Sequence, residues 1–143
     1  MLLHGRQLGR HPVRQGKLAC SDCHQPHGTT AQKQLVRATI NDTCYECHAE
    51  KRGPMLWEHQ PVTEDCSTCH AAHGSSNPGM VKMRGPVLCQ SCHSQQGHPS
   101  LAYGPSGLPG NPSPSTALAL GNCMNCHSQV HGSNHPSGSS LTR

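Results

Sequence analysis

One cysteine–histidine motif accounts for every cysteine in this chain. The pattern Cys-x-x-Cys-His begins at Cys20, Cys44, Cys66, Cys89 and Cys123. Two thiols three positions apart lie on one tight helical turn, where they match the two vinyl groups at one edge of a haem. The histidine that follows them lies beneath the iron as its proximal ligand. The motifs use all ten cysteines of the 143 residues, and they predict five covalently bound haem c groups, each with its iron.

The motif assigns the attachment residues directly. The cofactor-binding thioether bonds are expected at Cys20, Cys23, Cys44, Cys47, Cys66, Cys69, Cys89, Cys92, Cys123 and Cys126. The proximal iron ligands are expected to be His24, His48, His70, His93 and His127. No catalytic residue is predicted.

Other interpretations of Cys-x-x-Cys explain the sequence less well. A structural zinc site takes four ligands, so five cysteine pairs would leave one pair over or require five mixed Cys/His sites. A disulfide framework would have to pair cysteines across motifs and would give the adjacent histidines no role. Thioredoxin-like redox motifs need a βαβ context that this sequence lacks. Haem attachment explains both the cysteines and the histidine in every copy.

Composition predicts a fold with little protein core. Only 32% of the residues are hydrophobic, phenylalanine is absent, and the chain contains 15 glycines and 12 prolines. A chain of this length normally depends on burying a large share of its apolar surface, so either the chain is disordered or a non-protein group fills its centre. Ten cysteines and thirteen histidines are too many for a solvated linker and favour the second alternative. We therefore expect a multihaem cytochrome c fold: mainly coil with short α-helices, wrapped around a chain of stacked haems, and without significant β-sheet.

Helices are expected only in short segments. We predict a turn or two of helix at each haem motif, a segment near residues 31–39, and a final helix over about residues 115–130. Residues 103–114 are rich in Gly, Pro, Ser and Asn and are predicted to form a connecting loop.

An internal repeat divides the chain. His11-Pro-Val precedes the first haem motif, His59-Gln-Pro-Val precedes the third, and a second motif completes each of these units. His98-Pro precedes the fifth motif, which has no second motif after it. We interpret residues 1–143 as a single pentahaem domain with a two-haem unit at about 11–58, a two-haem unit at about 59–97 and a one-haem unit at about 98–143.

Eight more histidines are available as distal iron ligands: His4, His11, His27, His59, His73, His98, His131 and His135. A second axial ligand closes the position at which small molecules bind, so this supply favours electron transfer over substrate chemistry. His27 lies three residues after His24, and about 10 Å of extended chain is a poor tether to the opposite haem face. His27 and, likewise, His73 are therefore expected to ligate neighbouring haems.

The repeat assigns the distal ligands unit by unit. They are expected to be His11 and His27 in the first unit, His59 and His73 in the second, and His98 in the last. His131 and His135 compete with His98 for the last haem, and His4 is a further candidate. The methionines are expected to pack against porphyrin rather than bind iron. Two imidazoles at each iron predict a low-potential electron wire.

The charge balance does not indicate a nucleic-acid partner. The apoprotein carries a formal net charge of +4. Each ferric haem adds about −1, because its two propionates outweigh the single positive charge left on the iron porphyrin. Five haems bring the oxidised protein to about −1 and the reduced protein to about −6. The basic side chains are expected to pair with propionates or to line docking surfaces.

Three stretches give the chain a family resemblance. They are the run from Arg10 to Val13, the block from Cys44 to Gly53 followed by Trp57-Glu-His59, and the ending from Asn125 to Gly138. They resemble the C-terminal half of the decahaem periplasmic c-type cytochromes, which include the porin-threaded conduits of extracellular dimethyl-sulfoxide and metal respiration. The resemblance covers nearly the whole chain. It implies closely stacked haems, mostly or all with two histidine ligands, and a fold of coil and short helices.

Together these features predict a pentahaem c-type cytochrome that transfers electrons along closely packed bis-His haems in a respiratory or extracellular electron-transfer chain. The expected partners are a quinol-oxidising membrane cytochrome upstream and an outer-membrane or extracellular acceptor downstream. Two alternatives stay open: a subunit that associates with itself into a cytochrome filament, and a multihaem nitrite or sulfur-oxyanion reductase with one open iron position.

Haem attachment of this kind takes place outside the cytoplasmic membrane in bacteria, so we expect a periplasmic or extracellular location. The first residues, Met-Leu-Leu-His-Gly-Arg, lack the apolar segment and cleavage site of an export signal. No stretch of the sequence is long and apolar enough to span a membrane.

Overall fold

The computed structural model describes residues 9–93 and 122–142, and three short α-helices lie within them: α1 (Ile40–Tyr45), α2 (Gln60–Glu64) and α3 (Gly85–Gln90). The same residues also contain 3-10 turns at η1 (Pro12–Gln15), η2 (Cys20–Asp22), η3 (Gln32–Gln34), η4 (Ala49–Lys51), η5 (Cys66–Thr68), η6 (Pro78–Met80) and η7 (Cys123–Asn125). Extended pairing in these parts of the chain is limited to isolated bridges. The predicted fold class, coil with short helices and no sheet, is confirmed. The loop predicted at 103–114 lies outside the described residues.

Every haem motif is one closed helical turn. The backbone N–H of the motif histidine donates to the carbonyl of the first cysteine in all five copies, for example His24 to Cys20 at 2.9 Å and His93 to Cys89 at 2.8 Å. This four-residue hydrogen bond brings the two thiols to the same side of the turn. The predicted turn at each motif is therefore confirmed, as helix α1, helix α3 or a 3-10 turn.

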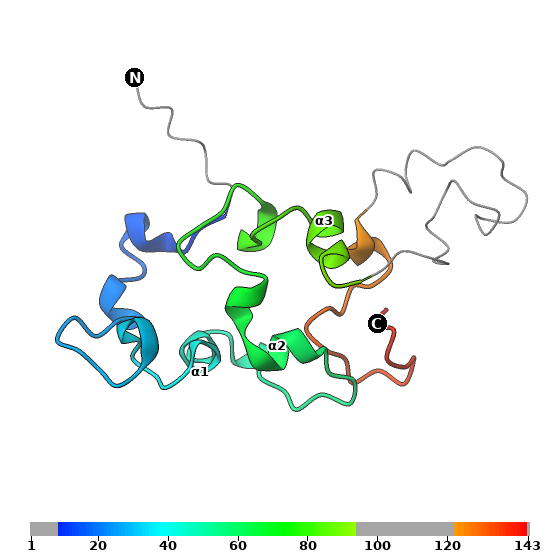
Figure 1. Ribbon diagram of the computed structural model, residues 1–143, viewed down its shortest axis with the longest axis horizontal. Helices are drawn as coiled ribbons and strands as arrows, with labels where there is room; N and C mark the ends of the chain where they lie inside the picture. Colours follow the sequence, from blue (N-terminus) through cyan, green and yellow to red (C-terminus); the bar gives the residue numbers. More distant parts are fainter. Residues whose placement is uncertain (1–8, 94–121, 143) are drawn as a thin grey trace, which may run out of the picture.

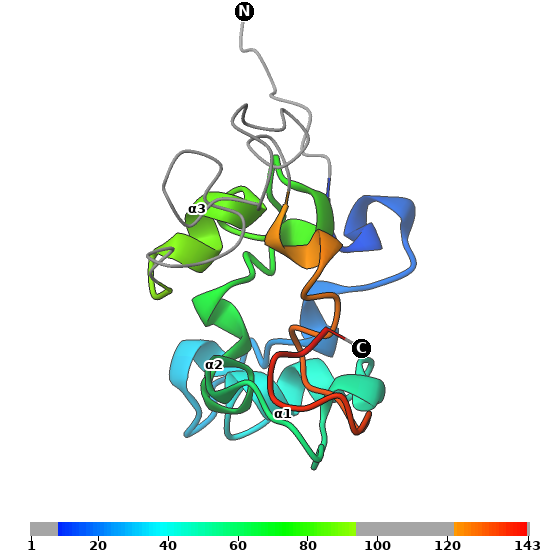
Figure 2. The same ribbon diagram turned by 90° about the vertical axis from the view of Figure 1, so that its right-hand side faces the viewer.

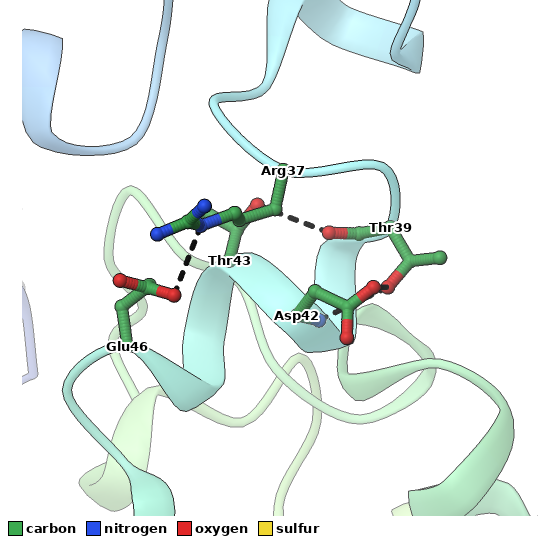
Figure 3. Close-up of polar contacts among 5 residues, drawn as sticks. All are labelled: Arg37, Thr39, Asp42, Thr43 and Glu46. Carbon is green, nitrogen blue, oxygen red and sulfur yellow. Dashed lines mark hydrogen bonds and ion pairs between the residues drawn. The ribbon is translucent and has the colours of Figure 1, made fainter.

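The helix that carries the second motif begins at a side-chain cap (Figure 3). The Thr39 hydroxyl oxygen accepts a hydrogen bond from the Asp42 N–H at 3.0 Å, and the Thr43 hydroxyl donates to the Thr39 carbonyl at 3.0 Å. Such a cap stabilises a short helix by about 1 kcal/mol. The ion pair between Arg37 and Glu46, at 2.9 Å, is exposed and adds little.

Two helix predictions need correction. Residues 31–39 form only η3, because Lys33 and Gln34 have left-handed φ angles of 57° and 54° that no α-helix accommodates. Of the helix predicted at 115–130, residues 115–121 lie outside the described chain. The remainder forms the short turn η7 and then coil.

A protein core is almost absent from the described residues. Leu35, 7% exposed, is the one buried hydrophobic side chain there, whereas Leu56 and Val87 are 63% and 56% exposed. Figures 1 and 2 show short helices dispersed along winding coil rather than packed in layers. Burial of apolar surface is the main favourable term in folding, so this chain lacks its usual source of stability. A large apolar group attached at the motifs would supply it.

None of the helices in the described parts of the chain has the length and hydrophobicity that a membrane span requires.

Candidate haem sites

Four pairs of histidine rings face each other across the described structure. Each pair joins one motif histidine to one of the further histidines: His11 with His48, His24 with His73, His59 with His93, and His70 with His131. The ring centroids lie 5.9–6.3 Å apart, and three of the pairs are stacked, with interplanar angles of 13–26°. Directly packed aromatic rings also fall in this range, and it is the separation expected of two imidazoles that coordinate one atom between them.

An iron atom fits this separation. A metal–imidazole nitrogen bond measures about 2.0 Å, and the coordinating nitrogen lies about 1 Å from the ring centre. Two axial imidazoles on one iron therefore place their centroids about 6 Å apart. The four ring pairs match this geometry, so the residues present fit a haem iron with two histidine ligands at each position.

Hydrogen bonds orient these rings for coordination through Nε2. The Nδ1–H of His24 donates to the Lys33 carbonyl at 2.9 Å, and that of His70 to the Gly79 carbonyl at 2.8 Å. The same bond to a main-chain carbonyl is made by His11, His59 and His127, at 2.6–2.9 Å. A proton held on Nδ1 leaves the Nε2 lone pair free for a metal and fixes the plane of the ring.

His135 has the opposite arrangement. Its Nδ1 accepts a hydrogen bond from the Ser137 N–H at 3.1 Å, so in the neutral ring the proton lies on Nε2. This tautomer does not offer Nε2 to a metal. His135, which the sequence left as a competitor for the last haem, is therefore poorly arranged as a ligand.

The first and third motifs are each followed by a loop that folds back and pairs with the motif, where it orients the motif histidine. Residues 33–36 pair with the first motif, where the Gln25 N–H donates to Gln34 and the Val36 N–H to Cys23 at 2.8 and 3.0 Å. The third motif repeats this, with the Ala71 N–H donating to Met80 at 2.8 Å. The left-handed residues that interrupt η3 are the turn of this loop, which is the physical reason that residues 31–39 do not form a helix.

Pairing between distant backbone segments delivers the other histidines. Gly9 pairs with Ser75 by two hydrogen bonds of 3.2 and 2.9 Å, and His11 donates to the Ala72 carbonyl, 61 positions away, at 2.7 Å. In the same way Trp57 pairs with Ser133 at 2.8 and 2.9 Å. His59 donates to the Val130 carbonyl, 71 positions away, at 2.9 Å. Each junction carries one of the candidate distal histidines on either side: His11 and His73 at the first, His59 and His131 at the second.

The observed pairing differs from the unit-by-unit assignment. His11 faces a histidine of its own unit as expected, and so does His59. His73, however, faces His24 of the first unit, and His131, an open candidate for the last haem, faces His70 of the second unit. Burial, together with Lys51 and neighbouring imidazoles, lowers the pKa of His131, which favours the neutral form that binds metal.

His27 is not brought to either haem motif of the first unit. Both proximal rings of that unit face other histidines, and His27 makes no ring contact with any described residue. The assignment of His27 to the first unit is therefore not supported. His4 and His98 lie outside the described residues.

The thiols of successive motifs influence one another electrostatically. Burial and the neighbouring Cys66 thiol raise the pKa of Cys44 to about 11, and burial with the neighbouring Cys123 thiol raises that of Cys89 to about 11. Burial, followed by the influence of Cys44, raises the pKa of Cys23. Burial, followed by the influence of Cys92, also raises the pKa of Cys69.

The helices that carry these thiols are also in contact. Helix α1 contacts η5, and α3 contacts η7, the orange turn beside α3 in Figures 1 and 2. Asn41, a buried residue that sequence reasoning missed, donates to the Val62 and Thr63 carbonyls and accepts from the Cys66 N–H at 2.7 Å. It joins the second motif to the third. No sequence signal distinguishes this asparagine from a surface one.

The described residues do not support the zinc or disulfide interpretations. All ten cysteines lie within them and are free thiols. No cluster of three or more metal-binding side chains occurs in residues 9–93 and 122–142, although a structural zinc site needs four ligands.

Comparison with known proteins decides the family. The family described as "Doubled CXXCH motif" matches residues 11–53 and 59–98, more than half of the sequence. The chain belongs to this family. Each matched range contains two of the Cys-x-x-Cys-His motifs.

A relative in Shewanella baltica (strain OS185), the "Multiheme cytochrome MtrA", is 56% identical to this cytochrome over 134 residues. These residues are 93% of the present chain and 40% of the relative, so the chain spans less than half of that protein. Over most of its own length the chain is thus similar to a multihaem cytochrome, and its Cys-x-x-Cys-His motifs support covalently bound haem c.

Proposed function

We propose that this chain carries five haem c groups in an unbranched row and passes electrons along them, as a relative of the C-terminal half of the decahaem conduits. The observation that carries the proposal is the set of four histidine pairs spaced for an iron. Bound haem supplies one-electron redox chemistry at its iron. The protein fixes how many haems are held, in which order and with which axial ligands.

The proposed ligands follow from the ring pairs. The proximal ligands are His24, His48, His70, His93 and His127, and the distal ligands of the first four are His73, His11, His131 and His59, in that order. For the haem of His127 we retain His98 as the distal ligand. The tautomer of His135 argues against that residue.

The thiol contacts support an order that follows the sequence. Cys23 lies near Cys44, Cys44 near Cys66, Cys69 near Cys92, and Cys89 near Cys123. Each thiol would bond to the edge of its haem, so neighbouring thiols bring the edges of successive haems together. The second motif contacts the third and the fourth contacts the fifth, and Cys44 and Cys92 influence the thiols of Cys23 and Cys69 electrostatically. These neighbours support a single electron path from the first motif to the fifth.

Two histidines at each iron favour an electron carrier over a reductase. A reductase needs an open coordination position for its substrate, whereas each of the four proposed iron positions lies between two imidazole rings. The hydrogen bonds from Nδ1 to main-chain carbonyls increase the basicity of the ligands. Together with bis-His ligation they favour low reduction potentials.

The cellular role is proposed from the resemblance to the decahaem periplasmic cytochromes. We infer an exported, periplasmic or extracellular cytochrome that accepts electrons from a quinol-oxidising membrane cytochrome and delivers them to an outer-membrane or extracellular acceptor. The proposed haem content brings the net charge from +4 in the apoprotein to about −1 when oxidised. This small charge is consistent with transient docking to redox partners rather than with binding to nucleic acid.

Low-temperature EPR of the oxidised protein, combined with a haem count by mass, tests the proposal. We expect five haems and five low-spin irons. His73→Ala should convert one iron, that of His24, to the high-spin state, whereas the matched His135→Ala should leave all five low-spin. A high-spin iron in the unaltered protein, or fewer than five haems, would contradict the proposed ligand set.

A further inference from the structure

The histidine of the second motif has a carboxylate where three of its counterparts have a carbonyl. The Nδ1–H groups of the first, third and fifth motif histidines each donate to a main-chain carbonyl at 2.6–2.9 Å. At His48, the Glu50 Oε1 atom lies 3.8 Å from Nδ1. This distance is too long for a direct hydrogen bond, but it is well within the range over which a charge acts through dilute salt.

This charge is specific to the second motif. Glu50 and Lys51 follow His48 by two and three positions, and no other motif histidine has Asp, Glu, Lys or Arg within three positions after it. The fourth motif is the second motif of the other matched range, and it has Gln95 and Gln96 at the equivalent positions. Glutamine has the shape of glutamate without its charge, so the repeat itself provides an uncharged version of this site.

Lys51 carries the opposite charge toward the next iron position. Its Nζ atom lies 4.0 Å from Glu50 Oε1. Burial is the largest cause that lowers the pKa of His131, and the positive charge of Lys51 is the next. Glu50 acts on His131 in the opposite direction and more weakly. At His131, whose ring faces that of His70, the effect of the cation therefore outweighs that of the anion.

Folding stability does not account for this ion pair. Both side chains are exposed, and an exposed pair of this kind contributes little to the free energy of unfolding. Its effect on a nearby iron is different, because the ferric and ferrous states differ by one unit of charge. An anion stabilises the ferric state and lowers the reduction potential, whereas a cation stabilises the ferrous state and raises it.

The two affected positions belong to neighbouring motifs. Helix α1, which carries part of the second motif, contacts η5 of the third. Asn41 of α1 also accepts a hydrogen bond from the Cys66 N–H at 2.7 Å. An electron that passes along the proposed row therefore crosses directly from the position of His48 to that of His70.

We propose that the charges of Glu50 and Lys51 make electron transfer from the haem of His48 to the haem of His70 energetically favourable. The carboxylate lowers the reduction potential at the first iron, and the ammonium raises it at the second. One electron moves: the iron of His48 is oxidised from ferrous to ferric, the iron of His70 is reduced from ferric to ferrous, and no bond or proton changes. This inference rests on the proposed five-haem function and gives the row a preferred direction at this position.

The expected size of the effect follows from the distance. Nδ1 of a ligating imidazole lies about 4 Å from its iron, so a carboxylate 3.8 Å from Nδ1 is at most about 8 Å from that iron. At this separation, one charge changes the ratio of reduced to oxidised iron by roughly 2- to 30-fold, between the dielectric constant of water and the lower value near a protein surface.

NMR of the haem methyl groups during stepwise reduction measures the potential of each haem, and contacts with the attached cysteines assign the signals. Glu50→Gln should raise the potential of the haem of His48, and Lys51→Gln should lower that of the haem of His70. Both substitutions reproduce the uncharged sequence of the fourth motif. Glu64→Gln is the matched control, since it removes an exposed carboxylate that accepts from Gln60 at 2.9 Å and keeps an acceptor oxygen. It should leave both potentials unchanged.

Exchanging the two charges separates their effect from any change in structure. The double variant Glu50→Lys with Lys51→Glu keeps the net charge of the protein. We expect the potential of the haem of His48 to rise and that of the haem of His70 to fall. Unchanged potentials in Glu50→Gln, or shifts of the same sign at both haems in the exchanged variant, would overturn the proposal.

EPR and a haem count on the same samples report on the proposed function separately. Five low-spin haems in a variant show that every iron keeps its ligands, so a shifted potential then comes from the altered charge. Five low-spin haems with unshifted potentials would overturn this inference alone. A missing or high-spin haem in the unaltered protein would contradict the proposed function and this inference with it.

Discussion

Replacing Gly132 with alanine should open the junction between Trp57 and Ser133. The new methyl group would lie 2.6 Å from Met55 Sδ and 3.2 Å from the Trp57 carbonyl oxygen. The methionine side chain can move, but the carbonyl belongs to the paired backbone and can move only if the bridge opens. Overpacking of this kind costs about 1–3 kcal/mol. The φ angle of 119° adds about 1–3 kcal/mol for any residue other than glycine.

Gly28→Ala separates these two costs. Gly28 has a φ angle of 97°, and an added methyl group meets nothing within 4 Å. Only the conformational cost of about 1–3 kcal/mol should apply there, and it should not reach the Trp57–Ser133 junction.

Amide hydrogen exchange at Trp57 and Ser133 measures opening of this junction directly. A loss of about 1–3 kcal/mol from overpacking corresponds to roughly 5- to 150-fold faster exchange. We expect this acceleration in Gly132→Ala and unchanged exchange at both amides in Gly28→Ala. Unchanged exchange in Gly132→Ala, or the same acceleration in both variants, would refute the reasoning that the junction is closed by backbone contact.

Three further variants test other parts of the structure. His73→Met should raise the reduction potential of the haem whose proposed proximal ligand is His24, because His/Met ligation gives higher potentials than bis-His ligation. Spectroelectrochemistry should show one of the five reduction potentials shifted upward, and five unchanged potentials would contradict the pairing of His24 with His73. Asn41→Leu leaves the Cys66 N–H without its acceptor and should lower the unfolding free energy by about 1–3 kcal/mol in guanidinium titration; no loss would show that the link between motifs is dispensable. Trp57→Phe removes the indole N–H that donates to the His135 carbonyl at 3.0 Å. It should lower the unfolding free energy by about 0.5–1.5 kcal/mol in the same assay.

The turn at each haem motif and the general fold could be predicted because they depend on adjacent residues. Cys20 to His24 form a single hydrogen-bonded turn, and the pattern of five residues contains everything that the turn requires. The poverty of apolar residues likewise predicted a chain without its own core, and Leu35 is the one buried hydrophobic residue in the described parts. Neither conclusion needs knowledge of how distant segments meet.

The prediction of a helix at residues 31–39 was wrong because of a tertiary contact. Local propensity permits a helix there, but the Lys33 carbonyl is needed by the imidazole of His24 at 2.9 Å. The left-handed backbone at Lys33 and Gln34 turns the Lys33 carbonyl toward His24. The hydrogen bond between His24 and the Lys33 carbonyl favours this turn, and no hydrophobic periodicity in the sequence indicates that bond.

By itself the sequence determined where the Cys-x-x-Cys-His turns lie and which further histidines are available as second ligands, because both follow from residue type and short spacing. Only the tertiary structure decided how those histidines pair. His73 faces His24 and His131 faces His70 because Gly9 pairs with Ser75 and Trp57 pairs with Ser133 across long stretches of chain. Contacts between residues so far apart depend on backbone hydrogen bonds that nearly any sequence can make, so no residue pattern marks them in advance.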